Sequence, residues 1–118
     1  MKTVLIVDDA AFMRMSLKIT LEKIGFKVIG EAATGIEAIS LYKQMKPDIV
    51  TMDITMPELS GIEALKMIKK IDKEAKVIII SALGQEVMIR EAVMAGAMTF
   101  IVKPFKEESI IQSLAKII

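Results

Sequence analysis

The chain contains a set of polar residues that could act together on a charged ligand. They are the adjacent pair Asp8 and Asp9, then Asp53, Ser81 and Lys103. Three carboxylates brought together repel one another unless a cation joins them, so the aspartates predict a metal site. Oxygen ligands select a hard ion, and Mg²⁺, which keeps several waters, suits so few protein ligands better than Ca²⁺ or Zn²⁺.

Asp53 is the candidate nucleophile of this set. A carboxylate can attack phosphorus, as it does in enzymes that form an aspartyl phosphate. Lys103 would supply a fixed positive charge, and Ser81 a hydroxyl donor, to a phosphoryl group on Asp53. These residue types therefore favour phosphoryl transfer to Asp53.

Each residue also has a purely structural interpretation. Asp8 or Asp9 could cap the first helix, because aspartate is a preferred N-cap. Asp53 could belong to a turn, and Lys103 could be a solvated surface lysine. Their joint placement favours the functional interpretation, because each of the four sites follows a different predicted strand.

The predicted strands are five short apolar runs rich in β-branched residues, and the stretches between them have helical periodicity. The runs are Val4 to Val7, Val28 to Ile29, Ile49 to Thr51, Val77 to Ile80 and Phe100 to Val102. Strands that alternate with helices through short connections form a parallel sheet with helices on both faces. The sequence therefore predicts a doubly wound α/β domain, in which ligands bind at the carboxyl ends of the strands.

The predicted helices have recognisable ends and apolar faces. Gly25 and Gly96 end the first and fourth helices, and capping boxes at Thr34 and Ser60 begin the second and third. The expected core positions are Ala38, Leu41, Tyr42 and Met45 in the second helix, Leu65, Ile68 and Ile71 in the third, and Ile110, Ile111, Leu114 and Ile117 in the fifth. In the fourth helix, at about 85–95, Val87, Ile89 and Val93 fall away from the core stripe and indicate a partner surface.

Composition limits the possible functions. A chain of 118 residues that is 53% hydrophobic suits one domain, and we expect residues 1–118 to form it. The absence of His and Cys excludes a Ser/His/Asp triad, a His-ligated zinc site and an internal phosphohistidine relay. A net charge of +1 does not indicate a nucleic-acid partner. Asp8 and Asp9 end the N-terminal apolar run before it reaches the length of a signal peptide core, so we expect a cytoplasmic protein. No apolar run approaches the roughly 20 residues of a membrane span either.

Several motifs resemble those of response-regulator receiver domains, and the resemblance covers essentially the whole chain. The motifs are Val-Asp-Asp-Ala from Val7, Met-Asp-Ile-Thr-Met-Pro around Asp53, Ser81-Ala82, and Val-Lys-Pro-Phe from Val102. The resemblance implies a flavodoxin-like (βα)5 fold with strand order 2-1-3-4-5. We expect residues 1–118 to form a single receiver domain without an output domain.

The resemblance also implies a role for each site residue. Asp53 would be the phospho-acceptor, with Asp9 and Asp53 binding Mg²⁺ directly and Asp8 acting through water. The backbone carbonyl of Thr55 would be a further ligand of the ion. Lys103 would pair with the phosphoryl group, and the bond between Lys103 and Pro104 would be cis.

Ser81 would be the switch hydroxyl of the family, and Phe100 would be the aromatic switch residue. Phe100 stands where the family often has Tyr, so it offers ring burial but no hydroxyl contact to a partner. Leu83, two residues after Ser81, lacks a polar group that could guide a hydrolytic water.

Within the family the motifs are most similar to those of chemotaxis regulators. The expected donor is a CheA-like histidine kinase, and the expected target is a flagellar or archaellar motor-switch or adaptor protein. That target would bind the face formed by the fourth helix, the fifth strand and the fifth helix. Such a protein is a switch that catalyses only its own phosphorylation and dephosphorylation. The alternatives are a phosphorelay intermediate, a fragment of a longer regulator, a small aspartate-nucleophile phosphatase and a flavodoxin.

Overall fold

The computed structural model describes residues 1–116, in which five strands alternate with five helices. The strands are β1 (Thr3–Val7), β2 (Lys27–Ala32), β3 (Ile49–Met52), β4 (Val77–Ser81) and β5 (Thr99–Val102). The helices are α1 (Ala11–Lys23), α2 (Gly35–Met45), α3 (Gly61–Ile71), α4 (Glu86–Met94) and α5 (Glu107–Ala115). The strands are parallel in the order β2-β1-β3-β4-β5, which confirms the predicted fold. Within the described residues, no helix is both long and apolar enough to cross a bilayer.

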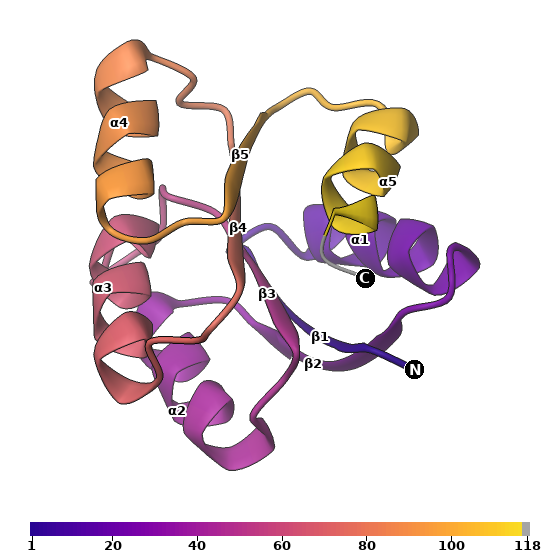
Figure 1. Cartoon of the computed structure of the whole chain (residues 1–118), viewed down its shortest axis with the longest axis horizontal. Coiled ribbons are helices and arrows are strands. Elements are labelled where there is room, and N and C mark those ends of the chain that lie inside the picture. Colours follow the sequence, from indigo (N-terminus) through magenta and orange to yellow (C-terminus); the bar gives the residue numbers. More distant parts are fainter. Residues whose placement is uncertain (117–118) are drawn as a thin grey trace.

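The sheet separates two layers of helices, with α1 and α5 on one face and α2, α3 and α4 on the other (Figure 1). Side chains of alternate residues of β1 pack against the two helical layers. Leu5 and Val7 join the apolar cluster under α2, α3 and α4, while Val4 and Ile6 join the cluster under α1 and α5. Burial on both faces explains why the strands are continuous apolar runs in the sequence.

Two helices end at glycines in the left-handed region, as predicted. Gly25 has φ of +99° and Gly96 has φ of +106°. After α1, the amide of Phe26 donates to the carbonyl of Leu21 at 3.0 Å, which is the long bond of a Schellman motif. The predicted beginnings of two helices are also confirmed, because Thr34 caps α2 and Ser60 caps α3 through their side chains.

Three of the predicted core positions are wrong. The confirmed ones are Ala38, Tyr42, Leu65, Ile68, Ile110 and Leu114, while Leu41 is half-buried and Ile117 lies outside the described residues. Met45 and Ile71 are 37% and 44% exposed, since each is the last residue of its helix. Ile111 is 38% exposed, because adjacent residues on a helix point about 100° apart and the preceding residue faces the sheet.

Candidate functional site

Strand register brings two buried aspartates side by side. Val7 in β1 pairs with Met52 in β3, so the following residues, Asp8 and Asp53, are neighbours at the carboxyl ends of the strands. The amide of Asp53 donates to the carbonyl of Val7 at 3.0 Å, which extends the ladder past the strand ends. This edge of the sheet is where doubly wound folds place their ligands.

The neighbouring pair of strands supplies Ser81 and Lys103. Ser81 pairs with Val102 in β5, and the amide of Lys103 donates to the carbonyl of Ser81 at 2.9 Å. The Ser81 hydroxyl is buried and accepts a hydrogen bond from the amide of Leu83 at 3.2 Å. The bond between Lys103 and Pro104 is cis. The four strand ends therefore place the predicted site residues along one edge.

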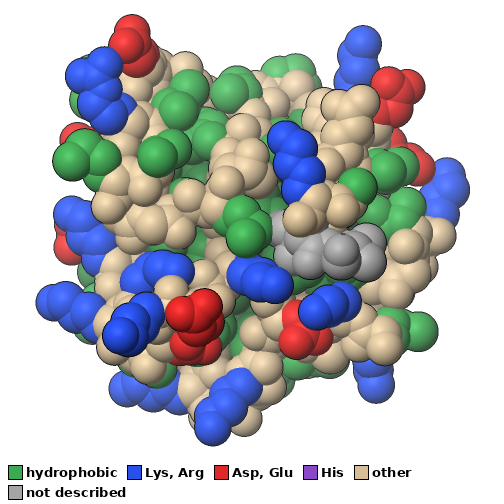
Figure 2. Space-filling view, viewed as in Figure 1, with side chains coloured by type: hydrophobic (Ala, Val, Ile, Leu, Met, Phe, Trp, Pro, Cys, Tyr) green, Lys and Arg blue, Asp and Glu red, His purple; other side chains and the backbone are tan. Residues whose placement is uncertain are grey.

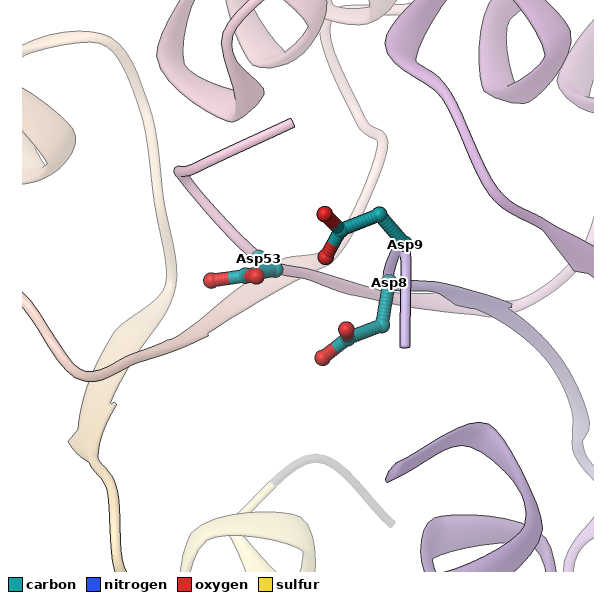
Figure 3. Close-up of side chains that lie close together, drawn as sticks. All are labelled: Asp8, Asp9 and Asp53. Atoms are coloured by element: carbon teal, nitrogen blue, oxygen red, sulfur yellow. The ribbon is translucent and has the colours of Figure 1, made fainter. Parts of the chain in front are cut away.

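Asp8, Asp9 and Asp53 gather at the ends of β1 and β3 (Figure 3). One oxygen from each carboxylate lies within 4.8 Å of the others. Asp8 and Asp53 are buried, whereas Asp9 is exposed, so the cluster has a protein side and an open side. An oxygen-only donor set that leaves room for water on one side fits a Mg²⁺ ion.

Lys103 lies among these carboxylates. Its Nζ is 2.7 Å from Oδ2 of Asp8 and 3.6 Å from Oδ2 of Asp53, and its side chain is only 15% exposed. Lys103 is therefore not a solvated surface lysine. The other Asp8 oxygen, Oδ1, accepts from the amide of Ala10 at 2.9 Å. Ala10 is the N-cap of α1, and among residues 1–116 no side chain caps this helix, which contradicts the alternative that Asp8 or Asp9 is its N-cap.

The pKa of Asp53 is raised above that of an ordinary aspartate, chiefly because burial disfavours its charged form. Lys103 opposes this effect by attracting the negative charge, while Asp8 adds to it by repulsion. The amide of Ile54, which donates to Oδ1 of Asp53 at 2.8 Å, lowers the pKa again. Burial therefore raises the pKa of Asp53 even though the Lys103 ammonium lies 3.6 Å from its Oδ2.

The loop from β3 to α3 approaches Asp53 closely. The amide of Gly61 donates to the carbonyl of Ile54 at 2.8 Å. A Cβ atom on Gly61 would overlap the carbonyl oxygen of Asp53, so this position has room only for glycine. The side chain of Thr55 is exposed, and its backbone carbonyl stays a predicted ligand.

The sequence matches the model of the response regulator receiver domain over residues 4–115. The chain belongs to this receiver family. It is 59% identical to the chemotaxis protein CheY of Thermotoga maritima, a match that covers 98% of this chain and 97% of that protein. It is 54% identical to the CheY of Bacillus subtilis, over 96% of this chain and 94% of the relative.

A solved structure agrees with the receiver assignment. The crystal structure of the CheX-CheY-BeF3-Mg²⁺ complex from Borrelia burgdorferi superposes with a TM-score of 0.96 at 43% identity, covering 98% of this chain and 88% of that one. Together with the relatives, this structure shows that the chain is a CheY-like receiver domain whose relatives of high identity include chemotaxis proteins. CheY-type receivers are regulatory switches rather than classical enzymes.

In this receiver domain, Phe100 lies in β5 and is half-buried. It packs against the apolar cluster under α2, α3 and α4, as Leu83 and Met88 also do. The ring therefore lies between the sheet and the helical layer to which α4 belongs. Its role as a switch stays a prediction.

Two residues that support the receiver site were not predicted from the sequence. Gly61 makes room for the backbone of Asp53, and Arg14 donates through Nη1 to the backbone carbonyl of Asp8 at 2.7 Å. A glycine directly after a helix N-cap was a usable signal, because glycine has low helix propensity and often marks a close backbone approach. The contact of Arg14 had no such signal.

Proposed function

We propose that this chain is a chemotaxis response regulator in which Asp53 accepts a phosphoryl group from a histidine kinase in a Mg²⁺-dependent reaction. The observation that carries this proposal is the position of Asp53, a buried carboxylate with a raised pKa that lies beside Asp8, Asp9 and Lys103. The high identity to CheY proteins supports the chemotaxis assignment.

Asp8, Asp9, Asp53 and the backbone carbonyl of Thr55 would hold the ion, with Asp8 acting through water. The three carboxylates offer only oxygen, which suits Mg²⁺, and the Borrelia burgdorferi CheY complex contains Mg²⁺. When bound, the ion supplies positive charge that offsets the carboxylates and the phosphoryl oxygens.

The transfer itself is a displacement at phosphorus. A carboxylate oxygen of Asp53 forms a bond to phosphorus while the bond from phosphorus to the imidazole nitrogen of the kinase breaks. The imidazole leaves with the electron pair of that bond. Lys103, which lies 3.6 Å from Oδ2 of Asp53, stabilises the charge that collects on the phosphoryl oxygens.

Phosphorylation would then shift the population between two conformations. The phosphoryl group draws the Ser81 hydroxyl away from the amide of Leu83, to which it is bound at 3.2 Å. Phe100, already half-buried against the same apolar cluster as Leu83, would move further into the space that is released. The altered face then binds its target better, since a ligand shifts an equilibrium toward the state it prefers.

The target would be a flagellar or archaellar motor-switch or adaptor protein. The kinase would be CheA-like, and the regulator itself would be cytoplasmic. The surface of α4, β5 and α5 supports the first assignment. The exposed apolar residues of these elements, and of the connection between α4 and β5, are Val87, Val93, Met94, Met98, Val102 and Ile111. Hydrophobic side chains reach the surface over α4 in Figure 2, whereas many Lys and Arg side chains lie in the lower part of the view. Exposed apolar patches often mark protein interfaces.

The test is intact-mass analysis after incubation with acetyl phosphate and Mg²⁺, followed by hydroxylamine, which cleaves acyl phosphates. We expect a phosphoryl adduct in the wild type that needs Mg²⁺ and is lost with hydroxylamine. Asp53→Asn should give no adduct. Asp72→Asn is the matched control, because Asp72 is exposed at the end of α3, and it should be modified like the wild type.

An adduct that persists in Asp53→Asn would show that another residue accepts the phosphoryl group. An unmodified wild type, under conditions in which another receiver is modified, would refute phosphoryl transfer to this chain. A wild-type adduct that passes on to a histidine phosphotransfer protein, with no change in target binding, would favour the phosphorelay alternative.

A further inference from the structure

The backbone carbonyl of Asp8 has an unusual partner. This oxygen lies one residue past the end of β1. The Nη1 atom of Arg14, one turn into α1, donates to this oxygen at 2.7 Å. The guanidinium thus ties the first helix back to the residue where the acidic cluster begins.

This hydrogen bond acts on the peptide group that joins Asp8 to Asp9. The peptide unit is planar, so fixing the carbonyl of Asp8 also fixes the amide and Cα of Asp9. Asp8 is held in addition by its amide, which donates to the carbonyl of Ala32 at 3.0 Å, and by both of its carboxylate oxygens. Asp9 is exposed, so its direction depends more on the backbone that carries it.

The guanidinium is itself held in place. Its Nε donates to Oε1 of Glu31 at 3.1 Å, and the Arg14 side chain is only 19% exposed. Glu31 lies in β2 opposite Ile6 of β1, two residues before Asp8. Arg14 therefore bridges α1, β2 and the end of β1 with two donors of one planar group, an arrangement that lysine cannot reproduce.

We infer that Arg14 is a positioning residue for the metal site, which aims the Asp9 carboxylate at the ion by fixing the peptide between Asp8 and Asp9. This inference rests on the proposed function, because it concerns the same Mg²⁺ site. Groups that orient metal ligands are commonly worth 10-fold or more in metal affinity.

The test compares the Mg²⁺ affinity of the wild type, Arg14→Gln and Arg14→Lys by isothermal titration calorimetry. Loss of positioning weakens binding, and we expect about a 10-fold loss in Arg14→Gln. Removal of a nearby positive charge alone would have the opposite effect and tighten binding. Arg14→Lys keeps the charge but not the planar pair of donors, and it should recover only part of the affinity.

Arg90→Gln is the matched control, because Arg90 is an exposed arginine on α4 that pairs with Glu86 in the same helix. It should bind Mg²⁺ like the wild type. Backbone order parameters of Asp9 and Ala10 in the metal-free protein give a second, metal-independent measurement. In Arg14→Gln these should fall from about 0.85, the value of a rigid backbone, toward 0.6.

Unchanged or tighter Mg²⁺ binding in Arg14→Gln, with Mg²⁺ binding intact in the wild type, would overturn the inference and leave the proposed function standing. Absence of Mg²⁺ binding in the wild type would instead refute the metal site. The order parameters would then decide the positioning claim, since unchanged values in Arg14→Gln contradict it.

Discussion

The Nζ of Lys103 lies 2.7 Å from Oδ2 of Asp8, which joins the end of β5 to the end of β1 across 95 residues of sequence. The same atom lies 3.6 Å from Oδ2 of Asp53. One partly buried cation is thus shared between two buried carboxylates. The Lys103 ammonium offsets part of the negative charge of these carboxylates. It should therefore weaken the binding of a metal ion to them.

Replacing Lys103 with methionine, of similar length but without charge, should tighten Mg²⁺ binding. A pair of unit charges at 4 Å contributes ~1 kcal/mol even in water, so we expect about a fivefold or greater gain in affinity. Calorimetric titration measures it, with the exposed Lys106→Met as control. Weaker binding in Lys103→Met would show that the ammonium organises the carboxylates more than it repels the ion.

Asp53→Asn should stabilise the metal-free protein at neutral pH by about 1 kcal/mol, a common size for a single-site effect. Because the folded-state pKa of Asp53 is raised, the folded protein binds more protons than the unfolded chain, and stability falls as pH rises through that window. The stabilisation by Asp53→Asn should therefore disappear at pH values below the ordinary aspartate pKa. Urea unfolding in EDTA from pH 3 to 8 measures it.

Asp48→Asn is the control, because it should change the stability at neutral pH in the opposite direction. Its amide partner Thr3 and the nearby lysines lower the pKa of Asp48, and Asp48 is exposed. Ionised Asp48 contributes stability that is present at neutral pH and is lost as pH falls through its lowered pKa. A gain at neutral pH in both variants would show that neutralising any aspartate stabilises the protein, contrary to a specific effect at Asp53.

Gly61→Ala should destabilise the protein by about 3 kcal/mol, the upper end of the usual cost of overpacking. The new methyl group would overlap backbone atoms of Asp53, which cannot move without disturbing β3. Thermal unfolding and Mg²⁺ titration should both show a loss. In Gly30→Ala the nearest atom belongs to the flexible Met45 side chain, so a much smaller effect is expected. Equal effects at the two positions would contradict this explanation.

Thr51→Val should stabilise the protein by about 1 kcal/mol. Oγ1 of Thr51 is buried and has no hydrogen-bond partner within the described residues, whereas valine has nearly the same shape without a polar atom. Chemical denaturation measures the change. Thr3→Val, which removes a hydroxyl bonded to Asp48, should instead destabilise the protein. No gain in Thr51→Val would indicate that the hydroxyl is satisfied in solution, for example by water.

The sequence predicted the fold and the placement of the site because both depend on short-range patterns. Asp8, Asp53, Ser81 and Lys103 each stand directly after or at the end of an apolar run. In a parallel sheet, strand ends that follow the same pattern must meet at one edge. The predicted parallel sheet therefore places these four residues at one edge, even though their side-chain contacts cannot be read from the sequence.

Other features depend on contacts between elements, which local patterns do not encode. Arg14 has the periodicity of any helical residue, and only the packing of α1 against β2 brings it to Glu31. Met45 and Ile71 fit the apolar stripes of their helices, but each is the last residue of its helix and is partly exposed there. The strand order 2-1-3-4-5 came from the family resemblance, because periodicity alone permits several orders.

The two apolar clusters on opposite faces of the sheet have a consequence for the thermodynamics of substitution. Leu17 of α1 and Leu65 of α3 are both buried, yet they belong to different clusters with a layer of backbone between them. Truncations at such separated positions have additive effects on the free energy of unfolding, to within about 0.5 kcal/mol. Each face of this receiver can therefore accumulate sequence changes independently of the other, as long as the strand ends that hold the aspartates stay in register.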